Sequence, residues 1–244
     1  MIALSIVIPA LNEASKITSD IEAAALFLVE TGERGEILIV DDGSTDDTAD
    51  TARNTVIPGS VDLIVIKQDR NYGKGFAVKT GMLRSHGSVV LFADSGNCVP
   101  YTNALPYIDK IRRGELDIAI GSRRLKNSII HKDQPLFRRF LSRIFHVAAV
   151  VIAGLPQKIK DSQCGFKVYD GEKARLLFSE NRIKGFLFDV EILIRAHKKG
   201  FRIQEFPIEW TCDLDSRLRP GSDAAGILKE LVSLRKIKAD KNSE

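Results

Sequence analysis

The feature that most constrains the fold is an apolar run that ends abruptly in acidic residues. Four consecutive aliphatic residues, 37–40, are followed directly by Asp41, Asp42 and Gly43. A short all-aliphatic run is typical of a strand that is buried on both faces of a parallel sheet. In an open α/β sheet the ligand crevice lies beyond the carboxyl ends of the strands, so both carboxylates would stand at its mouth. A solvated acidic turn would have the same sequence, so the residues at the ends of the other strands are needed to distinguish a ligand site from such a turn.

Further expected strands are apolar runs, and two of them end at a charged side chain. Residues 4–8 lead to Pro9, which is expected to break that strand; residues 88–93 lead to Asp94, and residues 117–122 lead to Arg123. Another strand is expected at residues 61–67. Helical patterns lie between the strands, at residues 12–31, 45–54 and 101–113, with Asn12 and Ser44 as the expected N-caps of the first two. The alternation predicts an α/β fold with a mainly parallel sheet. Two strands that end in carboxylates favour a functional site over a solvated turn.

The glycines of the chain exclude two kinds of nucleotide site and suggest a third. No glycine stands between Ile8 and the following helix, so the G-x-G-x-x-G of a dinucleotide site is missing. Residues 70–82 hold two glycines on either side of Lys74, without the spacing of a Walker P-loop. Backbone N–H groups next to a lysine can contact a phosphate. The chain is therefore not expected to bind NAD or FAD, but a phosphate contact near Lys74 is expected.

Charge is unevenly distributed along the 244 residues, of which 44% are hydrophobic and which we expect to form one domain. The net charge is +4, yet residues 123–143 hold seven Lys or Arg and a single acid, Asp133, a local charge of +6. A basic segment on a nearly neutral chain indicates a phosphate-bearing partner or an anionic surface, and not nucleic acid. Three cysteines without C-x-x-C spacing indicate reduced thiols in a cytosolic protein and no zinc site. No apolar run approaches the roughly 20 residues that span a bilayer, and no signal peptide is expected.

Three later segments bear on the acceptor side of a site. Residues 135–154 are helical in pattern, and their apolar part, 144–155, suits either the core or a lipid interface. A helix within residues 185–195 carries Asp189 and Glu191 near its start, where the helix dipole alone favours acids. Residues 201–211 form a last strand in which Pro207 indicates an edge or a bulge. Residues 222–244 are expected to be a docked amphipathic helix and a charged tail.

Seven short motifs in order resemble those of the family 2 glycosyltransferases, and among these the polyprenyl- and dolichyl-phosphate sugar transferases. They lie at residues 9–13, 40–46, 71–75, 92–94, 121–123, 161–167 and 188–191. The resemblance implies a GT-A fold, with a Rossmann-like nucleotide-binding half of strand order 3-2-1-4 joined to an acceptor half in one mixed, mainly parallel sheet. It divides the single domain into a nucleotide-sugar half (1–100), an acceptor half (101–222) and the C-terminal helix and tail (223–244).

The resemblance also implies roles for individual residues. The nucleotide-sugar would be bound by Pro9, Leu11, Glu13, Asp41, Asp42 and Lys74. Asp94 would open the D-x-D motif that holds Mg²⁺ or Mn²⁺ on the donor diphosphate, but its third position is Gly96, so Asn97 and water would complete a weaker metal site, or the dependence on metal would be reduced. The acceptor phosphate would be bound by Arg123 with Arg138 or Arg139. The catalytic residues would be Asp94, Arg123 and Asp189, the last as a base for a hydroxyl acceptor, because a phosphate acceptor is already anionic.

The expected activity is therefore inverting transfer of a hexose from a UDP-linked nucleotide-sugar to a polyprenyl or dolichyl phosphate. The enzyme would work in the cytoplasm, peripherally on the cytoplasmic face of a membrane. Two alternatives stay open: transfer to a soluble or cell-surface glycan, and a non-catalytic nucleotide-sugar binding module with a degenerate D-x-D.

Overall fold

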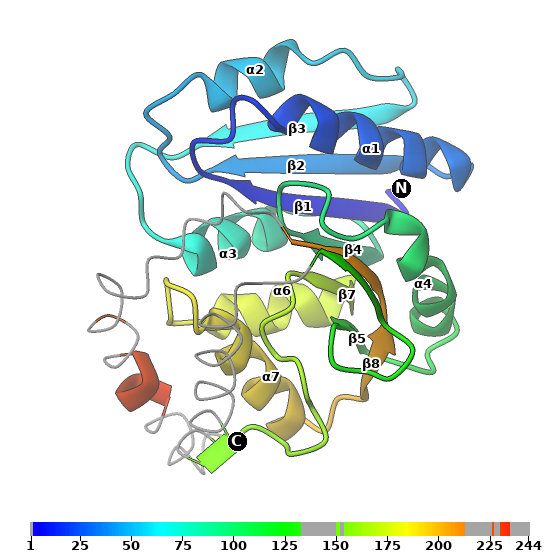
Figure 1. Cartoon of the computed structure of the whole chain (residues 1–244), viewed down its shortest axis with the longest axis vertical. Coiled ribbons are helices and arrows are strands. Elements are labelled where there is room, and N and C mark those ends of the chain that lie inside the picture. Colours follow the sequence, from blue (N-terminus) through cyan, green and yellow to red (C-terminus); the bar gives the residue numbers. More distant parts are fainter. Residues whose placement is uncertain (1, 133–149, 152–153, 213–225, 227–229, 235–244) are drawn as a thin grey trace.

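A seven-stranded sheet with helices on both faces forms the body of the protein (Figure 1). The structure, a computed structural model, describes residues 2–132, 150–151, 154–212, 226 and 230–234. The strands are β1 (Leu4–Ala10), β2 (Gly35–Asp41), β3 (Val61–Lys67), β4 (Val89–Ala93), β5 (Ile118–Ser122), β6 (Ile129–Lys132), β7 (Phe166–Asp170), β8 (Ile203–Pro207) and β9 (Glu209–Thr211). The helices are α1 (Ile17–Glu30), α2 (Thr48–Asn54), α3 (Lys74–Arg84), the 3₁₀ turn η1 (Tyr101–Ala104), α4 (Leu105–Arg112), α6 (Gly171–Glu180) and α7 (Phe188–Lys198).

The strand order is β3-β2-β1-β4-β7-β5-β8, which confirms the expected 3-2-1-4 order and its continuation into a second half of the same sheet. The pairs β3–β2, β2–β1, β1–β4 and β5–β8 are parallel, whereas β7 runs antiparallel to both β4 and β5. An antiparallel strand starts at the edge where its neighbours end. The register pairs Phe166, the first residue of β7, with Ala93, the last residue of β4. The segment that precedes β7 is thereby brought to the carboxyl edge of the sheet.

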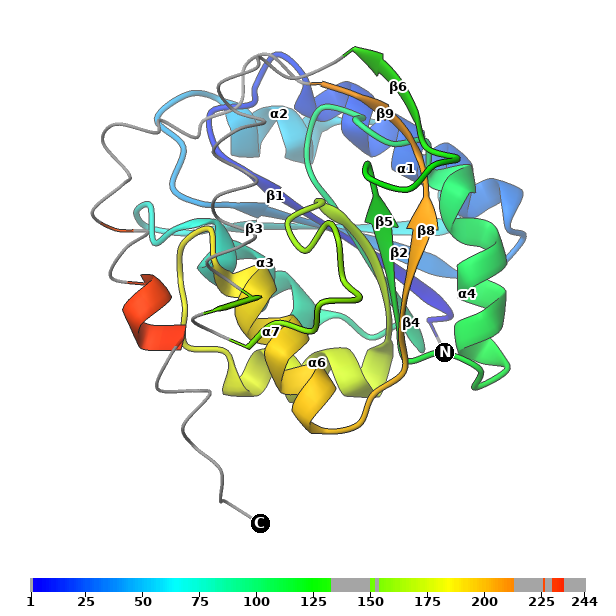
Figure 2. The same cartoon turned by 60° about the horizontal axis from the view of Figure 1, so that its bottom comes forward.

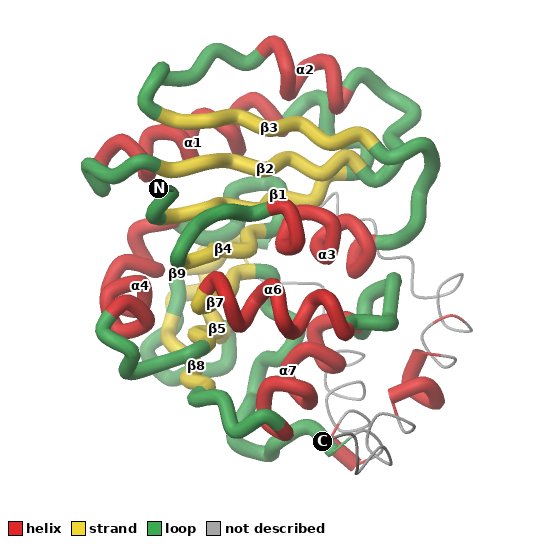
Figure 3. The backbone as a smooth tube through the Cα atoms, turned by 180° about the vertical axis from the view of Figure 1, so that it is seen from behind, coloured by secondary structure: helices red, strands yellow, loops and turns green. Residues whose placement is uncertain are grey.

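The central strands are buried because both of their faces are covered. Successive residues alternate between two clusters: Ile37 and Ile39 pack with α1, and Leu38 packs with α3. Figures 2 and 3 show this layering, with α1, α2 and α4 on one face and α3, α6 and α7 on the other. This two-sided burial is the physical reason why β1, β2 and β4 have nearly continuous apolar sequences.

Three expectations about element ends were wrong. Pro9 does not end β1, which continues to Ala10; β4 pairs with β1 only as far as Val7, so Pro9 has a strand neighbour on one side alone and its missing N–H is tolerated. Helix α1 begins at Ile17 and α2 at Thr48, and neither starts with a side-chain cap from Asn12 or Ser44. The two cap expectations were wrong because the side chains of Asn12 and Ser44 form hydrogen bonds between loops instead.

The expectation of an edge strand at Pro207 is confirmed, because β8 is the last strand of the sheet. Most of the segments expected as a helix at 135–154 and as a tail at 222–244 lie outside the described residues. Of the latter, residues 230–234 are helical, and Leu231 and Leu234 are buried in the cluster that contains α7. Within the described part of the chain, no helix has both the length and the hydropathy to cross a bilayer.

Candidate active site

The two acids that follow β2 are buried and hold backbone loops in place. Asp41 accepts a hydrogen bond from the Ser44 N–H at 2.8 Å, and Asp42 accepts from the N–H groups of Tyr72 and Gly73 at 2.9 Å each. Asp41 is 0% exposed and Asp42 is 3% exposed, so neither belongs to a solvated turn. Burial raises the pKa of Asp42, the two N–H groups lower it, and the charge of Asp41 adds to the rise. Oδ2 of Asp41 is buried without a hydrogen-bond partner among the described residues, so it can accept from a ligand hydroxyl or imide.

The loop after β1 meets the loop after β2 through side chains that sequence patterns had assigned to helix caps. Asn12, in the left-handed region at φ 54°, accepts through Oδ1 from the Thr45 N–H, and its own N–H donates to the Ser44 hydroxyl. The Glu13 N–H donates to the Thr48 hydroxyl at 2.8 Å. Pro9 is buried, Leu11 is half-buried and Glu13 is 5% exposed at this edge. The residues expected to line the nucleoside pocket therefore share one edge of the sheet.

Lys74 forms an ion pair with Asp94. It is the first residue of α3, and its Nζ lies 2.7 Å from Oδ1 of Asp94 and 5.7 Å from the centre of the Phe92 ring. Burial would lower the pKa of Lys74, but the carboxylates of Asp94 and Asp189 outweigh it and raise that pKa. Lys74 was expected near the nucleoside; the structure places its charge on the carboxylate that opens the D-x-D motif.

Asp94 is seated against the backbone of the segment that precedes β7. Its N–H donates to the Gly165 carbonyl at 2.8 Å, and a Cβ at Gly165 would lie 1.9 Å from Oδ2 of Asp94. Only a glycine leaves room for this carboxylate. The side chain of Asp94 is 32% exposed although Oδ1 is buried, so the exposure belongs to the other atoms, which include Oδ2.

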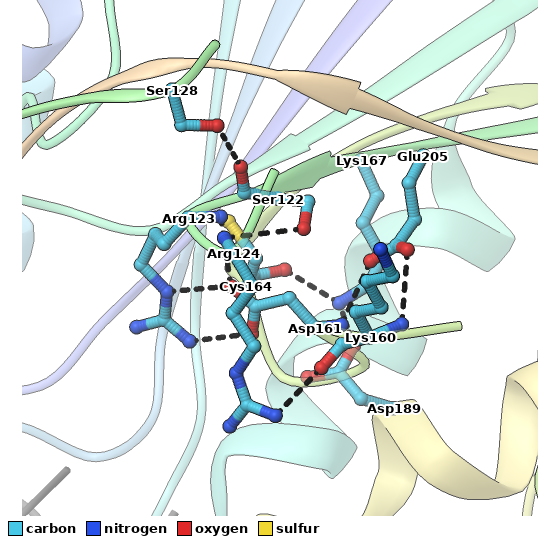
Figure 4. A network of polar contacts seen from close by, with 10 residues as sticks. All are labelled: Ser122, Arg123, Arg124, Ser128, Lys160, Asp161, Cys164, Lys167, Asp189 and Glu205. Carbon is cyan, nitrogen blue, oxygen red and sulfur yellow. Dashed lines mark hydrogen bonds and ion pairs between the residues drawn. The ribbon is translucent and has the colours of Figure 1, made fainter. Parts of the chain in front are cut away.

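Arg123, at the end of β5, is held by a buried carboxylate that the sequence analysis gave no role (Figure 4). Its Nε and Nη2 donate to Asp161 at 2.8 and 2.7 Å, and its N–H donates to the same side chain at 3.0 Å. Burial would raise the pKa of Asp161, but Arg123 lowers it; burial would lower the pKa of Arg123, but Asp161 and, more weakly, Cys164 and Asp94 raise it. Glu205 fixes the loop by accepting the Asp161 N–H at 2.7 Å. The face of the guanidinium lies 5.3 Å from the Trp210 ring.

Asp189 lies in the first turn of α7 and forms a buried ion pair. Lys167, at 0% exposure, donates from Nζ to Asp189 at 2.5 Å and to the Cys164 carbonyl at 2.6 Å (Figure 4). Burial raises the pKa of Asp189, while Lys167 and Lys74 act against the rise. The sequence signal for this pair was present but not interpreted, because a lysine within the apolar residues of β7 requires a buried anion. The role of Asp189 as a base stays a prediction.

The family model for "Glycosyl transferase family 2" matches residues 5–173. The chain belongs to glycosyltransferase family 2. This glycosyltransferase is 34% identical to the dolichyl-phosphate β-glucosyltransferase of Dictyostelium discoideum and 35% identical to that of Saccharomyces cerevisiae. Both alignments cover 96% of this chain and 74% of the relative.

Solved structures confirm the GT-A fold. The glucosyl-3-phosphoglycerate synthase of Mycobacterium tuberculosis, in complex with Mn²⁺, UDP and glucosyl-3-phosphoglycerate, superposes with a TM-score of 0.69 at 18% identity, covering 99% of this chain and 81% of that one. The mannosyl-3-phosphoglycerate synthase of Rubrobacter xylanophilus has a TM-score of 0.66 at 15% identity, with 100% and 76% covered. The same M. tuberculosis enzyme has also been solved with Mg²⁺ and UDP.

In this glycosyltransferase, the candidate metal ligands suit a divalent ion only when atoms of the substrate complete its coordination. Among the described residues no group of three or more His, Cys, Asp or Glu could hold a metal. Asn97, expected as a ligand, donates from its amide Nδ2 to the Ser19 carbonyl at 3.1 Å. Asp94 offers a partly exposed carboxylate, whereas Asp189 is paired with Lys167, and Mg²⁺ is commonly held by one or two carboxylates with substrate phosphates and water. The residues fit such an ion with the diphosphate present, and they do not form a metal site by themselves.

Of the remaining expected site residues, Arg138 and Arg139 lie outside the described residues, and their binding of an acceptor phosphate stays a prediction. The structure brings Lys74, Asp94 and Asp189 together at one edge, and Asp94 also influences the pKa of Arg123. Asp161, Gly165 and Lys167 join them through the antiparallel strand β7.

Proposed function

We propose that this family 2 enzyme transfers glucose from UDP-glucose to a polyprenyl phosphate of the dolichyl-phosphate type. The observation that carries the proposal is the ion pair of Lys74 with Asp94, which sets a cation and a partly exposed carboxylate at the carboxyl edge of the sheet, beside the loops of Asp41 and Asp42. The names of the relatives support the acceptor and the sugar, and the complexes of the structural neighbours support the donor nucleotide.

On the donor side, the nucleoside would lie against the loops that follow β1 and β2, with the orphaned Oδ2 of Asp41 accepting a hydrogen bond from it. Lys74 would turn from Asp94 toward the diphosphate, where its ammonium stabilises the negative charge that develops on the leaving group. A divalent ion held by Asp94 and the donor phosphates would add Lewis-acid stabilisation of the same charge.

On the acceptor side, a phosphate monoester carries its own negative charge and needs little help from a base. Arg123 would face it with the edge of the guanidinium that Asp161 leaves open, since Nε and Nη2 are bound to Asp161 and Nη1 makes no hydrogen bond to a described residue. The proposal extends to Arg138 and Arg139 as further phosphate ligands and to a membrane surface as the place where the lipid is met. Asp189 would act as a base only for a hydroxyl acceptor, and it would then have to leave Lys167.

The test is a donor panel of UDP- and GDP-sugars with a polyprenyl phosphate, followed by lipid extraction of the product. We expect glucose from UDP-glucose in the lipid fraction. A glycosylated product that stays in water would indicate a soluble glycan acceptor, and nucleotide binding without turnover would indicate a binding module.

A charge reversal tests the acceptor side separately. Replacing Arg138 and Arg139 by Glu should raise the acceptor KM far more than the donor KM and abolish binding to anionic liposomes, since each basic residue near such a surface contributes about 1 kcal/mol. Arg34→Glu with Arg53→Glu is the matched control, because both are exposed, paired with Asp62 and Asp50, and change the net charge equally. Equal rises of both constants, or liposome binding unaltered by the reversal, would contradict this part of the proposal.

A further inference from the structure

The turn that follows Asp94 contains two consecutive residues in the left-handed region of backbone space. Gly96 has a φ of 93° and Asn97 a φ of 47°. Successive residues of this kind can direct neighbouring N–H groups at one anion. Here the anion is the carboxylate of Asp20, in the first turn of α1. The Gly96 N–H lies 2.9 Å from each of its oxygens, and the Asn97 N–H is close enough to lower the pKa of the same carboxylate.

Asp20 is only 1% exposed, and burying a charged carboxylate costs desolvation free energy. Burial raises its pKa to about 6, although the N–H groups of Gly96 and Asn97 act against the rise; the charge of Glu13 adds to it and Lys16 opposes it. Tyr101 packs close enough for the charge of Asp20 to add to the rise that burial causes in the tyrosine pKa. The N–H groups of Gly96 and Asn97 lower the pKa of Asp20 more strongly than the charge of Lys16 does, so the two backbone N–H groups are its principal partners.

The amide clamp, as we name Asp20 with the N–H groups of Gly96 and Asn97, acts on the residue that faces the donor. Gly96 is two positions after Asp94, and Asp94 is bound on its other side to the Gly165 carbonyl. The backbone around Asp94 is thus held on both sides, by the segment before β7 through Asp94 and by α1 through Gly96. The left-handed φ of Gly96 also disfavours any L side chain there, so this turn does not present a second carboxylate at the third position of the motif.

We propose that Asp20 is a positioning residue for the transfer reaction, which fixes the turn after Asp94 so that one carboxylate suffices where a D-x-D motif supplies two. Asp20 does not touch the donor, because its oxygens are buried and occupied by backbone N–H groups. The inference rests on the proposed function for its kinetic consequence, but the clamp itself can be tested without any turnover.

The variant is Asp20→Asn, which keeps the shape but removes the charge and replaces one of the two acceptor oxygens by an N–H₂ group. We expect faster hydrogen exchange at Gly96 and Asn97 in the ligand-free protein. We also expect Mn²⁺ affinity in the presence of UDP to fall about 10- to 100-fold, as is usual when a group that supports a metal ligand is removed. With UDP-glucose, kcat should fall roughly 10- to 100-fold from misplacement of Asp94, with less change in donor KM.

Glu36→Gln is the matched control for loss of a buried carboxylate. Glu36 is 2% exposed and accepts from the Ser5 hydroxyl and the His86 N–H at 2.6 Å each, at the opposite end of the strands. It should lower the melting temperature without altering Mn²⁺ affinity or the exchange of the Gly96 amide.

Two results would overturn the proposal. One is unchanged exchange of the Gly96 and Asn97 amides in Asp20→Asn. Another is an equal loss of Mn²⁺ affinity in Asp20→Asn and Glu36→Gln, which would reduce Asp20 to a residue of general stability. An absence of transferase activity in every variant and in the wild type would reject the proposed function alone, since exchange and Mn²⁺ binding would still report on the clamp.

Discussion

We expect Lys74 to compete with a divalent cation for Asp94, and replacing Lys74 should reveal this competition. In the ligand-free protein the ammonium lies 2.7 Å from Oδ1 of Asp94. At an effective dielectric constant of 20 the Coulomb energy at this distance is about 6 kcal/mol. The two side chains are 28% and 32% exposed, so solvent screening and ordering reduce the net contribution to about 1–2 kcal/mol. A cation that binds Asp94 must first overcome this amount.

The variant Lys74→Met keeps most of the volume over Phe92 and removes the charge. Mn²⁺ should then bind the nucleotide-free protein roughly 5- to 30-fold more tightly, the factor that corresponds to 1–2 kcal/mol. The effect on turnover should have the opposite sign. Loss of a cation aimed at the leaving diphosphate should lower kcat about 10²- to 10³-fold, as removal of one stabilising donor does elsewhere.

The assay is Mn²⁺ titration followed by electron paramagnetic resonance, with and without UDP, together with steady-state kinetics on UDP-glucose. Lys199→Met is the matched control, because Lys199 is 33% exposed, pairs with Glu180 at 2.8 Å and changes the net charge equally, far from Asp94. Mn²⁺ affinity that is unchanged or weaker in Lys74→Met, or equally tightened in Lys199→Met, would refute the competition. Tighter Mn²⁺ with undiminished kcat would show that the ammonium does not act on the leaving group.

The remaining predictions concern the seat of Asp94, the nucleoside edge and acid stability. Gly165→Ala should displace the Asp94 carboxylate and reduce kcat at least about 10-fold, with a melting temperature near that of the wild type. The control is Gly59→Ala, which has open space around it and should leave the kinetics unchanged. Normal kinetics in Gly165→Ala would mean that the position of Asp94 is not critical. Asp42→Ala should weaken UDP binding in calorimetry and also destabilise the fold by about 1–3 kcal/mol in urea, because the Tyr72 and Gly73 N–H groups lose their acceptor; unchanged UDP affinity would move the nucleoside site away from this edge. For Asp117, which is 3% exposed, burial raises the pKa but hydrogen bonds from Arg202 and Lys173 outweigh it and hold the pKa below its ordinary range. A lowered carboxylate pKa stabilises the folded state above the unfolded pKa of about 4, and this stabilisation is lost as the pH falls through the folded pKa. Asp117→Asn should therefore lower the free energy of unfolding at neutral pH and make it fall less steeply in acid, as measured by urea unfolding across that pH range. An acid limb as steep in Asp117→Asn as in the wild type would contradict this assignment.

Sequence by itself determined the fold class, because its signals are local. An all-aliphatic run such as residues 37–40 has few explanations other than a strand covered on both faces, and the helical patterns between such runs fix a right-handed, mainly parallel arrangement. The chain positions of Asp41, Asp42 and Asp94 at strand ends then place them at one edge of the sheet, which the structure confirms. Short motifs in a constant order indicated the family, which the family model then showed.

Tertiary structure decided which of those groups act on one another. The cap patterns at Asn12 and Ser44 failed because their polar atoms bind a loop about 32 residues away and not their own helix. No local pattern indicates that β7 enters the sheet antiparallel, yet this one reversal brings Gly165 against Asp94 and Lys167 to Asp189. Asp20 is separated from Gly96 by 76 residues, and no local sequence pattern indicates this contact. Its role depends on burial and on two N–H directions, and both exist only after the chain has closed around it.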